Sequence, residues 1–286
     1  TEPIAYLSVK YSVPEKIVQR LIDAYGFETA AEIVSFRPAE RLETVRANMM
    51  RMDDAAFEAF MTRRGWHWRR GTVPGAYLVE QAGNLANDPD YYSGEFSVQG
   101  ESSMLAARAV EPRPGMTVLD ACAAPGGKSF TLAEYMENTG VLDAFDLYKG
   151  RVNLIKKGAE RLDLSIIRAA VRDAATGVCE KQYDRVLCDV PCSGLGVIRR
   201  KPEIRYKKQE SFKELPALQL KILEHSAQLV RPGGILFYST CTLRNAENGA
   251  VVTEFLKCHP EFEPYDLPET EGISHTVNEP KFMRTM

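Results

Sequence analysis

Two cysteines stand in short motifs that follow apolar segments: Cys192 ends Asp-Val-Pro-Cys, and Cys241 ends Ser-Thr-Cys. The apolar segments at 185–190 and 235–239 are expected to be strands. A single cysteine in such a place is usually a small buried apolar residue. Two cysteines at the ends of neighbouring strands indicate thiol chemistry, a metal site or a disulfide.

The surrounding residues favour thiol chemistry. A metal would need further cysteine or histidine ligands, and His225 and His259 lie within or after expected helices without suitable spacing. A thiolate that adds to C6 of cytosine makes C5 able to attack an electrophilic methyl group. A carboxyl group such as Asp189, near N3 and the amino group of the base, favours this addition. A second acid–base group must then help to remove the C5 proton and the thiol.

A loop of small residues at 120–128 (Asp-Ala-Cys-Ala-Ala-Pro-Gly-Gly-Lys) joins an expected strand at 117–121 to an expected helix at 128–136. Small residues and paired glycines let a backbone approach a ligand closely. A Walker A loop is one interpretation, but Cys122 stands where its first glycine is required. A dinucleotide fingerprint is absent. A third interpretation is a methyltransferase loop that holds the amino-acid part of S-adenosylmethionine.

Carboxylates follow four consecutive expected strands, namely Asp120, Asp146, Asp173 and Asp189. Asp146 is placed to accept bonds from both ribose hydroxyls of a nucleotide-like cofactor. Asp173 is placed to hold an adenine amino group. Any one of them alone would more often be a helix cap or a loop carboxylate. The four together favour a cofactor that contains a nucleoside.

Composition restricts the class of protein. The 286 residues carry a net charge of -3, from 36 basic and 39 acidic residues, which argues against coating nucleic acid through bulk charge. RNA contacts must then come from local basic runs at 63–70 and 199–208, although such runs are usually solvated surface. No apolar stretch could span a membrane, and no signal peptide is visible. The six cysteines include no Cys-x-x-Cys pair, so we expect a cytoplasmic protein without a metal.

From residue 117 onward, apolar strand segments alternate with helical segments, which predicts an α/β fold with a mostly parallel, doubly wound sheet. Ligands bind beyond the carboxyl ends of the strands in such sheets. The expected strands are 117–121, 141–145, 166–171, 185–190 and 235–239, and the expected helices are 128–136, 151–162, 215–229 and 245–258.

Residues 1–94 are expected to form a separate small α/β domain. Apolar residues at helical spacing predict a helix at 13–25, with Ser12 as its cap and Pro14 in its first turn. Further helices are expected at 28–36 and 54–63, and strands at 42–48 and 76–79.

The motifs closely resemble those of the NOL1/NOP2/Sun family of RNA cytosine-5 methyltransferases, over about residues 94–258. The resemblance implies a Rossmann-like methyltransferase domain at 95–286, preceded by an RNA-binding accessory domain at 1–94. It implies Cys241 as the nucleophile, Cys192 as the residue that assists product release, and Asp189 and Lys128 beside the target base. It also implies an S-adenosylmethionine site made of Cys122, Ala123, Ala124, Pro125, Gly126, Gly127, Lys128, Asp146, Arg151, Asp173 and Asp189.

Within this family, residues 46–48, 96–99 and 194–206 are similar to the bacterial group that methylates 16S ribosomal RNA, the methyltransferases B. Members of the group usually begin with a helical domain that resembles the antitermination factor NusB. They usually end with a Gly-x-Asp-Gly-Phe-Phe strand. We expect this sequence to start after the first feature and to stop before the second.

The target cytosine must be unpaired or flipped out of its helix before it can react. Basic residues that directly follow the first cysteine motif are expected to line the RNA path, namely Arg199, Arg200, Lys201 and Arg205. We expect ribosomal RNA to be the partner. We also expect the protein to be a monomer. A transfer RNA methyltransferase, a non-catalytic RNA-binding scaffold and a DNA cytosine methyltransferase remain alternatives, and the two cysteines favour RNA over DNA.

Overall fold

The structure is a computed structural model that describes residues 2–35, 42–80, 82–178, 180–198, 200–207, 212–265, 274–275 and 283–284. The chain divides into two compact units. Unit 1 consists of Thr1–Ala39, Pro191–Lys221 and Thr240–Glu263, and unit 2 consists of Glu40–Val190, Ile222–Ser239 and Pro264–Met286. No helix in the described part of the chain is long and apolar enough to cross a membrane.

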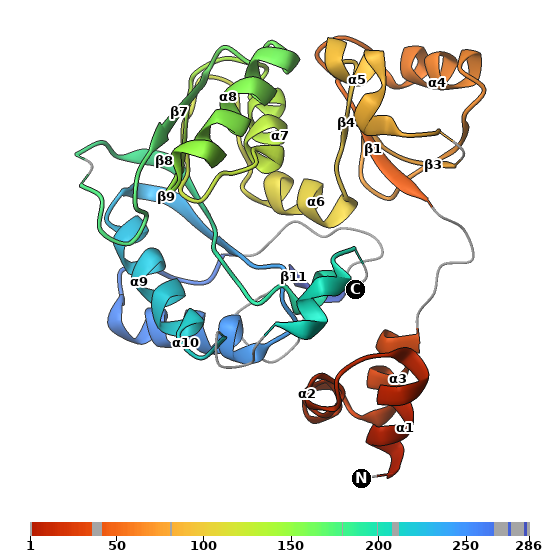
Figure 1. Cartoon of the computed structure of the whole chain (residues 1–286). Helices are drawn as coiled ribbons and strands as arrows, with labels where there is room; N and C mark the ends of the chain where they lie inside the picture. The colour runs from red at the N-terminus through yellow and green to blue at the C-terminus, as the bar shows by residue number, and fades with distance from the viewer. Residues whose placement is uncertain are drawn as a thin grey trace. The chain divides into compact units, whose positions relative to one another are not determined.

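Unit 1 begins with three helices, α1 (Glu2–Tyr11), α2 (Glu15–Tyr25) and α3 (Phe27–Ser35), which Figure 1 shows in red as one group. α2 buries Ile17, Val18 and Leu21, which share one helix face because of their spacing. The apolar core of this group also includes Leu195 and Ile204, which lie just beyond the first cysteine motif. The N-terminal helices therefore support the segment that follows Cys192.

The expected cap of α2 is wrong. Ser12 has a left-handed backbone with φ 52°, and Pro14 occupies the N-cap position without a side-chain hydrogen bond. A cap must directly precede the first helical turn, and Ser12 lies too far from Glu15 to fill that place. The rest of unit 1 contains η2 (Leu195–Val197), η3 (Pro202–Tyr206), η5 (Asn245–Glu247), α10 (Gly249–Cys258) and the beginning of α9 (Leu215–Ala227).

Unit 2 contains an antiparallel sheet with strand order β2-β3-β1-β4. Its elements are β1 (Glu43–Ala47), β2 (His67–Arg70), β3 (Ala76–Glu80), β4 (Phe96–Val98), α4 (Asp54–Arg63), η1 (Leu85–Asn87) and α5 (Pro89–Ser93). Aromatic side chains fill the core between sheet and helix, with Phe57, Tyr77 and Phe96 fully buried. Asp53 caps α4 by accepting a hydrogen bond from the N–H of Ala56 at 2.8 Å.

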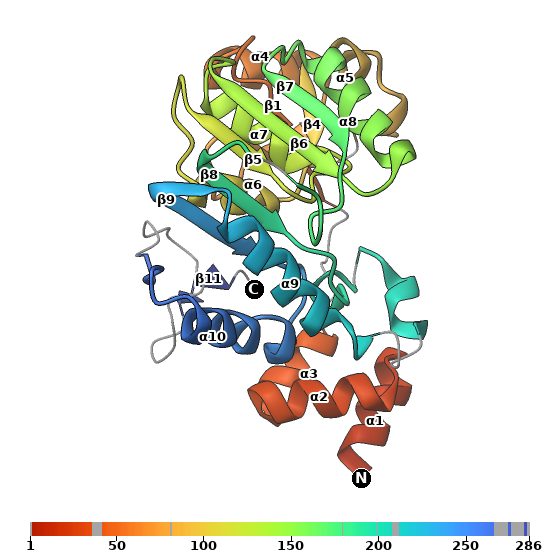
Figure 2. The ribbon, with the colours of Figure 1, turned by 90° about the vertical axis from the view of Figure 1, so that its left-hand side faces the viewer.

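The second sheet of unit 2 has five parallel strands in the order β7-β6-β5-β8-β9 (Figure 2). The strands are β5 (Thr117–Asp120), β6 (Val141–Asp146), β7 (Ile167–Val171), β8 (Tyr183–Asp189) and β9 (Val230–Ser239). Unit 2 also contains the helices α6 (Glu101–Ala109), α7 (Gly127–Tyr135) and α8 (Lys149–Leu162). The chain adds β6 and β7 on one side of β5 and then β8 and β9 on the other side. In open α/β sheets, such a reversal of direction leaves a crevice at the carboxyl ends of the strands, where ligands bind. The α/β fold with a doubly wound sheet is confirmed.

The unit boundaries differ from the sequence-based boundary between residues 94 and 95. The helices α1 to α3 belong to unit 1, whereas the sheet that contains β1 belongs to unit 2. The accessory role of residues 1–94 stays a prediction. Two short strands, β10 (Ser274–His275) and β11 (Met283–Arg284), pair near the C-terminus.

Candidate active site

The loop between β5 and α7 turns sharply at Gly126. Gly126 has φ +114°, a left-handed conformation that residues with a Cβ rarely adopt. A Cβ at this position would lie 2.3 Å from the ring of Phe130, so only glycine fits. α7 starts at the next residue, Gly127, and its first turn presents backbone N–H groups that can bind an anionic ligand group.

Asp120 is a fully buried carboxyl group at the end of β5. Its Oδ2 accepts a hydrogen bond from Ser129 Oγ at 2.7 Å. Its Oδ1 has no hydrogen-bond partner in the described part of the chain. Burial raises the pKa of Asp120 to about 7, although the bond from Ser129 acts in the opposite direction. An unpaired buried oxygen is a natural contact for a polar ligand group.

Asp146 ends β6 and is joined to the loop through Arg151. The Arg151 guanidinium lies 3.3 Å from Asp146 Oδ2 and also donates to the carbonyl of Ala124 at 2.7 Å. The N–H of Tyr148 donates to Asp146 Oδ1 at 3.2 Å. Arg151 therefore fixes the distance between the loop and the end of the neighbouring strand.

Asp173 forms a local turn. Its Oδ1 accepts from the N–H of Ala175 at 2.8 Å, and its Oδ2 accepts from Thr176 Oγ1 at 2.9 Å. This is the loop-carboxylate role that the sequence left open, and adenine binding by Asp173 stays a prediction. Asp189, by contrast, ends β8 and pairs with Lys128 Nζ at 2.7 Å.

These residues of unit 2 fit S-adenosylmethionine. Gly126 lets the loop turn sharply into α7. Asp120, with its buried Oδ1, ends β5, and Asp146 ends the neighbouring strand β6. The Asp146 side chain is only 3% exposed. Its carboxylate has about four lone-pair positions, so it can accept hydrogen bonds from a ligand in addition to those from Arg151 and Tyr148. Loop 122–128 and Asp146 are the residues that would hold the cofactor.

Helix α7 is held by a buried network that reaches from the antiparallel sheet. Gln99 Nε2 donates to the carbonyl of Gly127 at 3.1 Å, and its Oε1 accepts from Arg46 Nε at 2.7 Å and Thr131 Oγ1 at 2.9 Å. Arg46 also forms an ion pair with the buried Glu134. The sequence indicated residues 46–48 and 96–99 only as family similarities, and it did not predict their contacts with α7.

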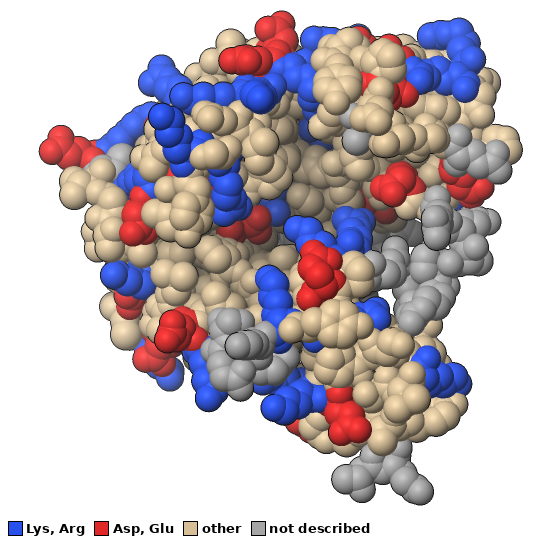
Figure 3. Space-filling model, viewed as in Figure 1, with Lys and Arg blue, Asp and Glu red and all other residues tan. Residues whose placement is uncertain are grey.

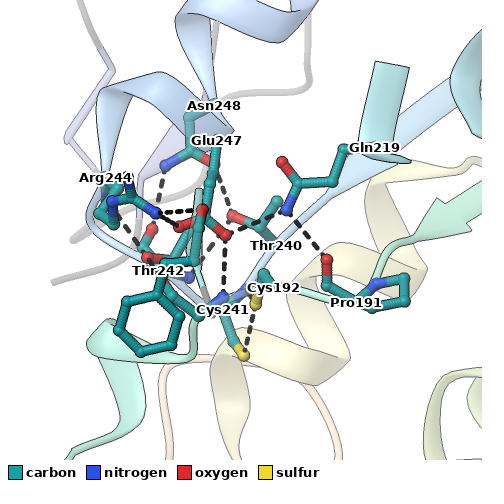
Figure 4. A network of polar contacts seen from close by, with 11 residues as sticks. Pro191, Cys192, Gln219, Thr240, Cys241, Thr242, Arg244, Glu247 and Asn248 are labelled. Atoms are coloured by element: carbon teal, nitrogen blue, oxygen red, sulfur yellow. Dashed lines mark hydrogen bonds and ion pairs between the residues drawn. The ribbon is translucent and has the colours of Figure 1, made fainter. Parts of the chain in front are cut away.

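Cys192 and Cys241 come together in unit 1, with their Sγ atoms 3.1 Å apart (Figure 4). The backbone N–H of Cys241 donates to Cys192 Sγ at 3.3 Å. The hydrogen bond with Cys241 and burial raise the pKa of Cys192 well above its usual range. Neither cysteine forms a disulfide. The described residues contain no group of three or more histidine, cysteine or acidic side chains that could hold a metal.

A polar network surrounds the two cysteine loops, which are the loops that carry Cys192 and Cys241. Glu247 is fully buried and binds the amide of Gln219 and the guanidinium of Arg244 (Figure 4). It also accepts from the backbone N–H of Ser193 at 2.8 Å. Ser193 Oγ and Thr242 Oγ1 are hydrogen-bonded to each other at 2.7 Å, which links the loops a second time.

The backbone around Cys241 is fixed by its own contacts. The N–H of Gly196 donates to the carbonyl of Cys241 at 3.0 Å, and a Cβ at Gly196 would lie 2.9 Å from the same oxygen. Asn248 accepts from Thr240 Oγ1 and donates to the carbonyl of Thr242 at 3.0 Å. The sequence missed this network, and its one visible sign was the mostly polar run 244–248, which begins three residues after Cys241.

The expected RNA-binding residues have different surroundings. Arg200 and Lys201 are exposed, and Arg199 lies outside the described residues. Arg205 donates to the carbonyls of Tyr11 at 3.4 Å and Ser12 at 3.2 Å, so it fastens η3 to the N-terminal helices. An RNA contact of these residues stays a prediction.

The basic run at 63–70 is partly neutralised. Arg64 pairs with Asp88 and Asp90, and Arg70 pairs with Glu58 at 2.6 Å. Figure 3 shows basic and acidic side chains interspersed over the displayed surface. This mixture agrees with the small net charge of -3.

A family model described as 16S rRNA methyltransferase RsmB/F matches residues 107–286. The chain belongs to this family. The family is one of S-adenosylmethionine-dependent methyltransferases, as the loop at 120–128 predicts.

Curated relatives agree with this assignment. A probable ribosomal RNA small subunit methyltransferase B of Bacillus subtilis is 43% identical over 92% of this chain and 60% of the relative. A tRNA (cytosine(49)-C(5))-methyltransferase of Pyrococcus abyssi is 30% identical over 89% of this chain and 84% of the relative. The chain spans about 60% of the length of the first ribosomal relative.

Solved structures share the fold. A methyltransferase homolog protein from Pyrococcus horikoshii has a TM-score of 0.77 at 25% identity, covering 90% of this chain and 83% of that one. NSun6 from Pyrococcus horikoshii, solved with SFG, has a TM-score of 0.80 at 18% identity, covering 93% of this chain and 91% of that one. The second likeness concerns the fold alone.

Proposed function

We propose that the protein methylates C5 of a cytosine in RNA, with S-adenosylmethionine as the methyl donor and Cys241 as the nucleophile. The observation that carries this proposal is the pair of thiols at Cys192 and Cys241, whose sulfurs are 3.1 Å apart. Membership of the RsmB/F family supports the class of reaction. The non-catalytic scaffold has no such support, because a scaffold needs no paired thiols.

In the proposed reaction, the Cys241 thiolate forms a bond to C6 of the cytosine ring. The electron pair of the C5–C6 double bond shifts to C4–C5, and the electron pair of the C4–N3 double bond moves onto N3. A hydrogen bond donated by the protein at the N3 edge stabilises the resulting charge. The Lys128 ammonium is the donor assigned to this edge, and its partner Asp189 is assigned to accept from the exocyclic amino group of the base. C5 becomes nucleophilic as a result. Bound S-adenosylmethionine supplies an electrophilic methyl group for C5.

Release of the product requires two further events. A base takes the C5 proton, the C5–C6 double bond re-forms, and the bond between C6 and Cys241 Sγ breaks, so that sulfur leaves with its electron pair. Cys192 is assigned to this stage. Its raised pKa keeps it a protonated thiol, which can hydrogen-bond to the departing Cys241 sulfur.

Cys192 is the third residue after Asp189, and Cys241 is the second after Ser239. Asp189 and Ser239 face each other at the ends of β8 and β9. Loop 122–128, Asp146, Arg151, Asp173 and Asp189 are the proposed cofactor residues.

Ribosomal RNA is the proposed substrate. The relative named as a ribosomal enzyme is 43% identical, whereas the relative named as a transfer RNA enzyme is 30% identical. The expectations of a monomer that acts in the cytoplasm without a metal stay predictions.

The test combines cysteine variants with labelled cofactor and RNA. Cys192→Ser should accumulate a covalent RNA–protein adduct, and Cys241→Ser should form none and transfer no methyl group. Cys258→Ser, which changes an exposed cysteine at the end of α10, should behave like the parent protein. Full turnover by Cys241→Ser would refute the proposal. Mapping of 5-methylcytosine in 16S ribosomal RNA and in transfer RNA then identifies the substrate.

A further inference from the structure

We propose that Glu247 is a positioning residue for Cys192 and that its carboxylate sets the rate at which the methylated product is released. This inference rests on the proposed role of Cys192 in product release. Glu247 has no place in the reaction itself, because each of its carboxylate oxygens is engaged by neighbouring protein donors.

Glu247 is a carboxylate with zero exposure. Its Oε2 accepts from the N–H of Ser193 at 2.8 Å and from Gln219 Nε2 at 3.0 Å. Its Oε1 accepts from the Arg244 guanidinium at 2.7 Å. A buried charge is retained only when it is paired and hydrogen-bonded in this manner.

These contacts hold the peptide groups on both sides of Cys192. Ser193, whose N–H binds Glu247, directly follows Cys192. Pro191 directly precedes Cys192, and its carbonyl accepts from Gln219 Nε2 at 2.9 Å. Gln219 is itself bound to Glu247, so one carboxylate fixes the backbone before and after the Cys192 thiol.

Cys241 depends on other groups. Its carbonyl accepts from the N–H of Gly196 at 3.0 Å, and its flanking residues Thr240 and Thr242 are held by Asn248. Loss of the Glu247 charge should therefore displace Cys192 more than Cys241, because Cys241 keeps its bond to Gly196 and its neighbours keep theirs to Asn248. A displacement of about 1 Å at a reacting group can slow its step by about 100-fold.

The carboxylate cannot be replaced by an amide without loss. Three donors, from Ser193, Gln219 and Arg244, converge on two oxygens that only accept. In Glu247→Gln, the new NH2 group must face one of these donors whichever way the amide turns. Gln219→Met keeps the charge of Glu247 and removes the donor to Pro191, so it disturbs the same loop by a different route.

The experiment follows single turnovers with RNA and labelled S-adenosylmethionine, and measures adduct formation and adduct decay separately on denaturing gels. Glu247→Gln should form the adduct within about twofold of the parent rate and release it at least about tenfold more slowly. Gln219→Met should show the same pattern with a smaller delay. Asp143→Asn is the matched control, because Asp143, like Glu247, is a buried carboxylate with a basic partner. That partner is Lys181, whose Nζ lies 2.7 Å from Asp143 Oδ2. It should leave both rates unchanged.

Each outcome decides between the two proposals. If Cys192→Ser accumulates adduct and Glu247→Gln slows formation and release equally, Glu247 only stabilises the fold and the positioning role is refuted. If Glu247→Gln does not fold, as thermal unfolding would reveal, Gln219→Met decides, and normal release by that variant refutes the role. If Cys192→Ser itself accumulates no adduct, the proposed function of Cys192 fails first.

Discussion

The backbone N–H of Cys241 donates to Cys192 Sγ at 3.3 Å, while the Sγ atoms of the same two residues are 3.1 Å apart. Cys192 sulfur therefore accepts one hydrogen bond from the backbone and shares a proton with the neighbouring sulfur. The hydrogen bond with Cys241 and burial raise the pKa of Cys192, which favours the thiol form of Cys192. A thiolate is needed for nucleophilic attack, and the proposed function assigns that role to Cys241.

Removal of Cys241 should make Cys192 reactive. The hydrogen bond with Cys241 is the largest cause of the raised pKa of Cys192, so its loss should lower that pKa. Only thiolates react with iodoacetamide, and Cys192 should therefore be alkylated at pH 8 at least about threefold faster in Cys241→Ala than in the parent. Peptide mass spectrometry measures this, with the exposed Cys258 as an internal reference. Equal rates in both proteins would contradict the assignment of the proton.

Asp120 should make the stability of the cofactor-free protein depend on pH. Its pKa is about 7 when folded and about 3.9 when unfolded, so between these values the folded state keeps a proton that the unfolded state has lost. The free energy of unfolding should fall as pH rises from about 4 to 7, by roughly 4 kcal/mol at most. Asp120→Asn should remove this component. Urea unfolding at pH 5 and pH 8 tests the prediction, and parallel pH profiles of the two proteins would contradict it.

Gly196→Ala should impair Cys241 without affecting the cofactor. The added Cβ would lie 2.9 Å from the carbonyl oxygen of Cys241, too close to be tolerated without a backbone shift. We expect methyl transfer to fall by about 10- to 100-fold, because the nucleophile is displaced. Affinity for S-adenosylhomocysteine should stay within about twofold. Gly150→Ala, where a Cβ meets open space, is the control and should keep full activity.

Gln99→Leu should weaken cofactor binding. It removes the bond to the Gly127 carbonyl and leaves Arg46 and Thr131 without their shared acceptor. A disrupted buried network of this kind costs about 1–3 kcal/mol, which corresponds to roughly 5- to 150-fold in affinity. Calorimetry with S-adenosylhomocysteine provides the measurement, and the exposed change Gln19→Leu is the control. Unchanged affinity would show that α7 is held by other contacts.

Arg200→Ser combined with Lys201→Ser should weaken RNA binding and its dependence on salt. Each lost phosphate contact to a single strand should reduce the slope of log affinity against log salt by about 0.7. Arg205→Gln should instead lower the thermal stability of the chain, because Arg205 binds the carbonyls of Tyr11 and Ser12. An unaltered salt slope after the double substitution would exclude Arg200 and Lys201 from the RNA path.

The sequence predicted the parallel sheet well because each strand contains a short apolar run, although β9 begins at Val230, five residues before the expected strand at 235–239. β5, β6 and β8 end at Asp120, Asp146 and Asp189 as expected, and the motifs lie at these ends. The prediction for Asp173 was less specific, since an aspartate that follows a strand can equally form a turn with its own neighbours.

The network around the thiols could not be predicted from local pattern. Glu247 lies 54 residues from Ser193 and 28 residues from Gln219, and nothing near Gln219 in the sequence indicates a buried acceptor. The sequence also missed α1 and β2, which are short elements with mixed polar and apolar residues. Their place is set by packing against other segments, not by their own periodicity.

Unit 1 is assembled from three separate stretches of the chain, and unit 2 from the stretches between and after them. A protease that cuts once, even at a boundary between the units, therefore leaves them covalently joined through the remaining crossings. The fragment 1–39 would still be retained by its apolar contacts with Leu195 and Ile204. A nicked protein should thus migrate as one species under native conditions and separate into pieces only in denaturant.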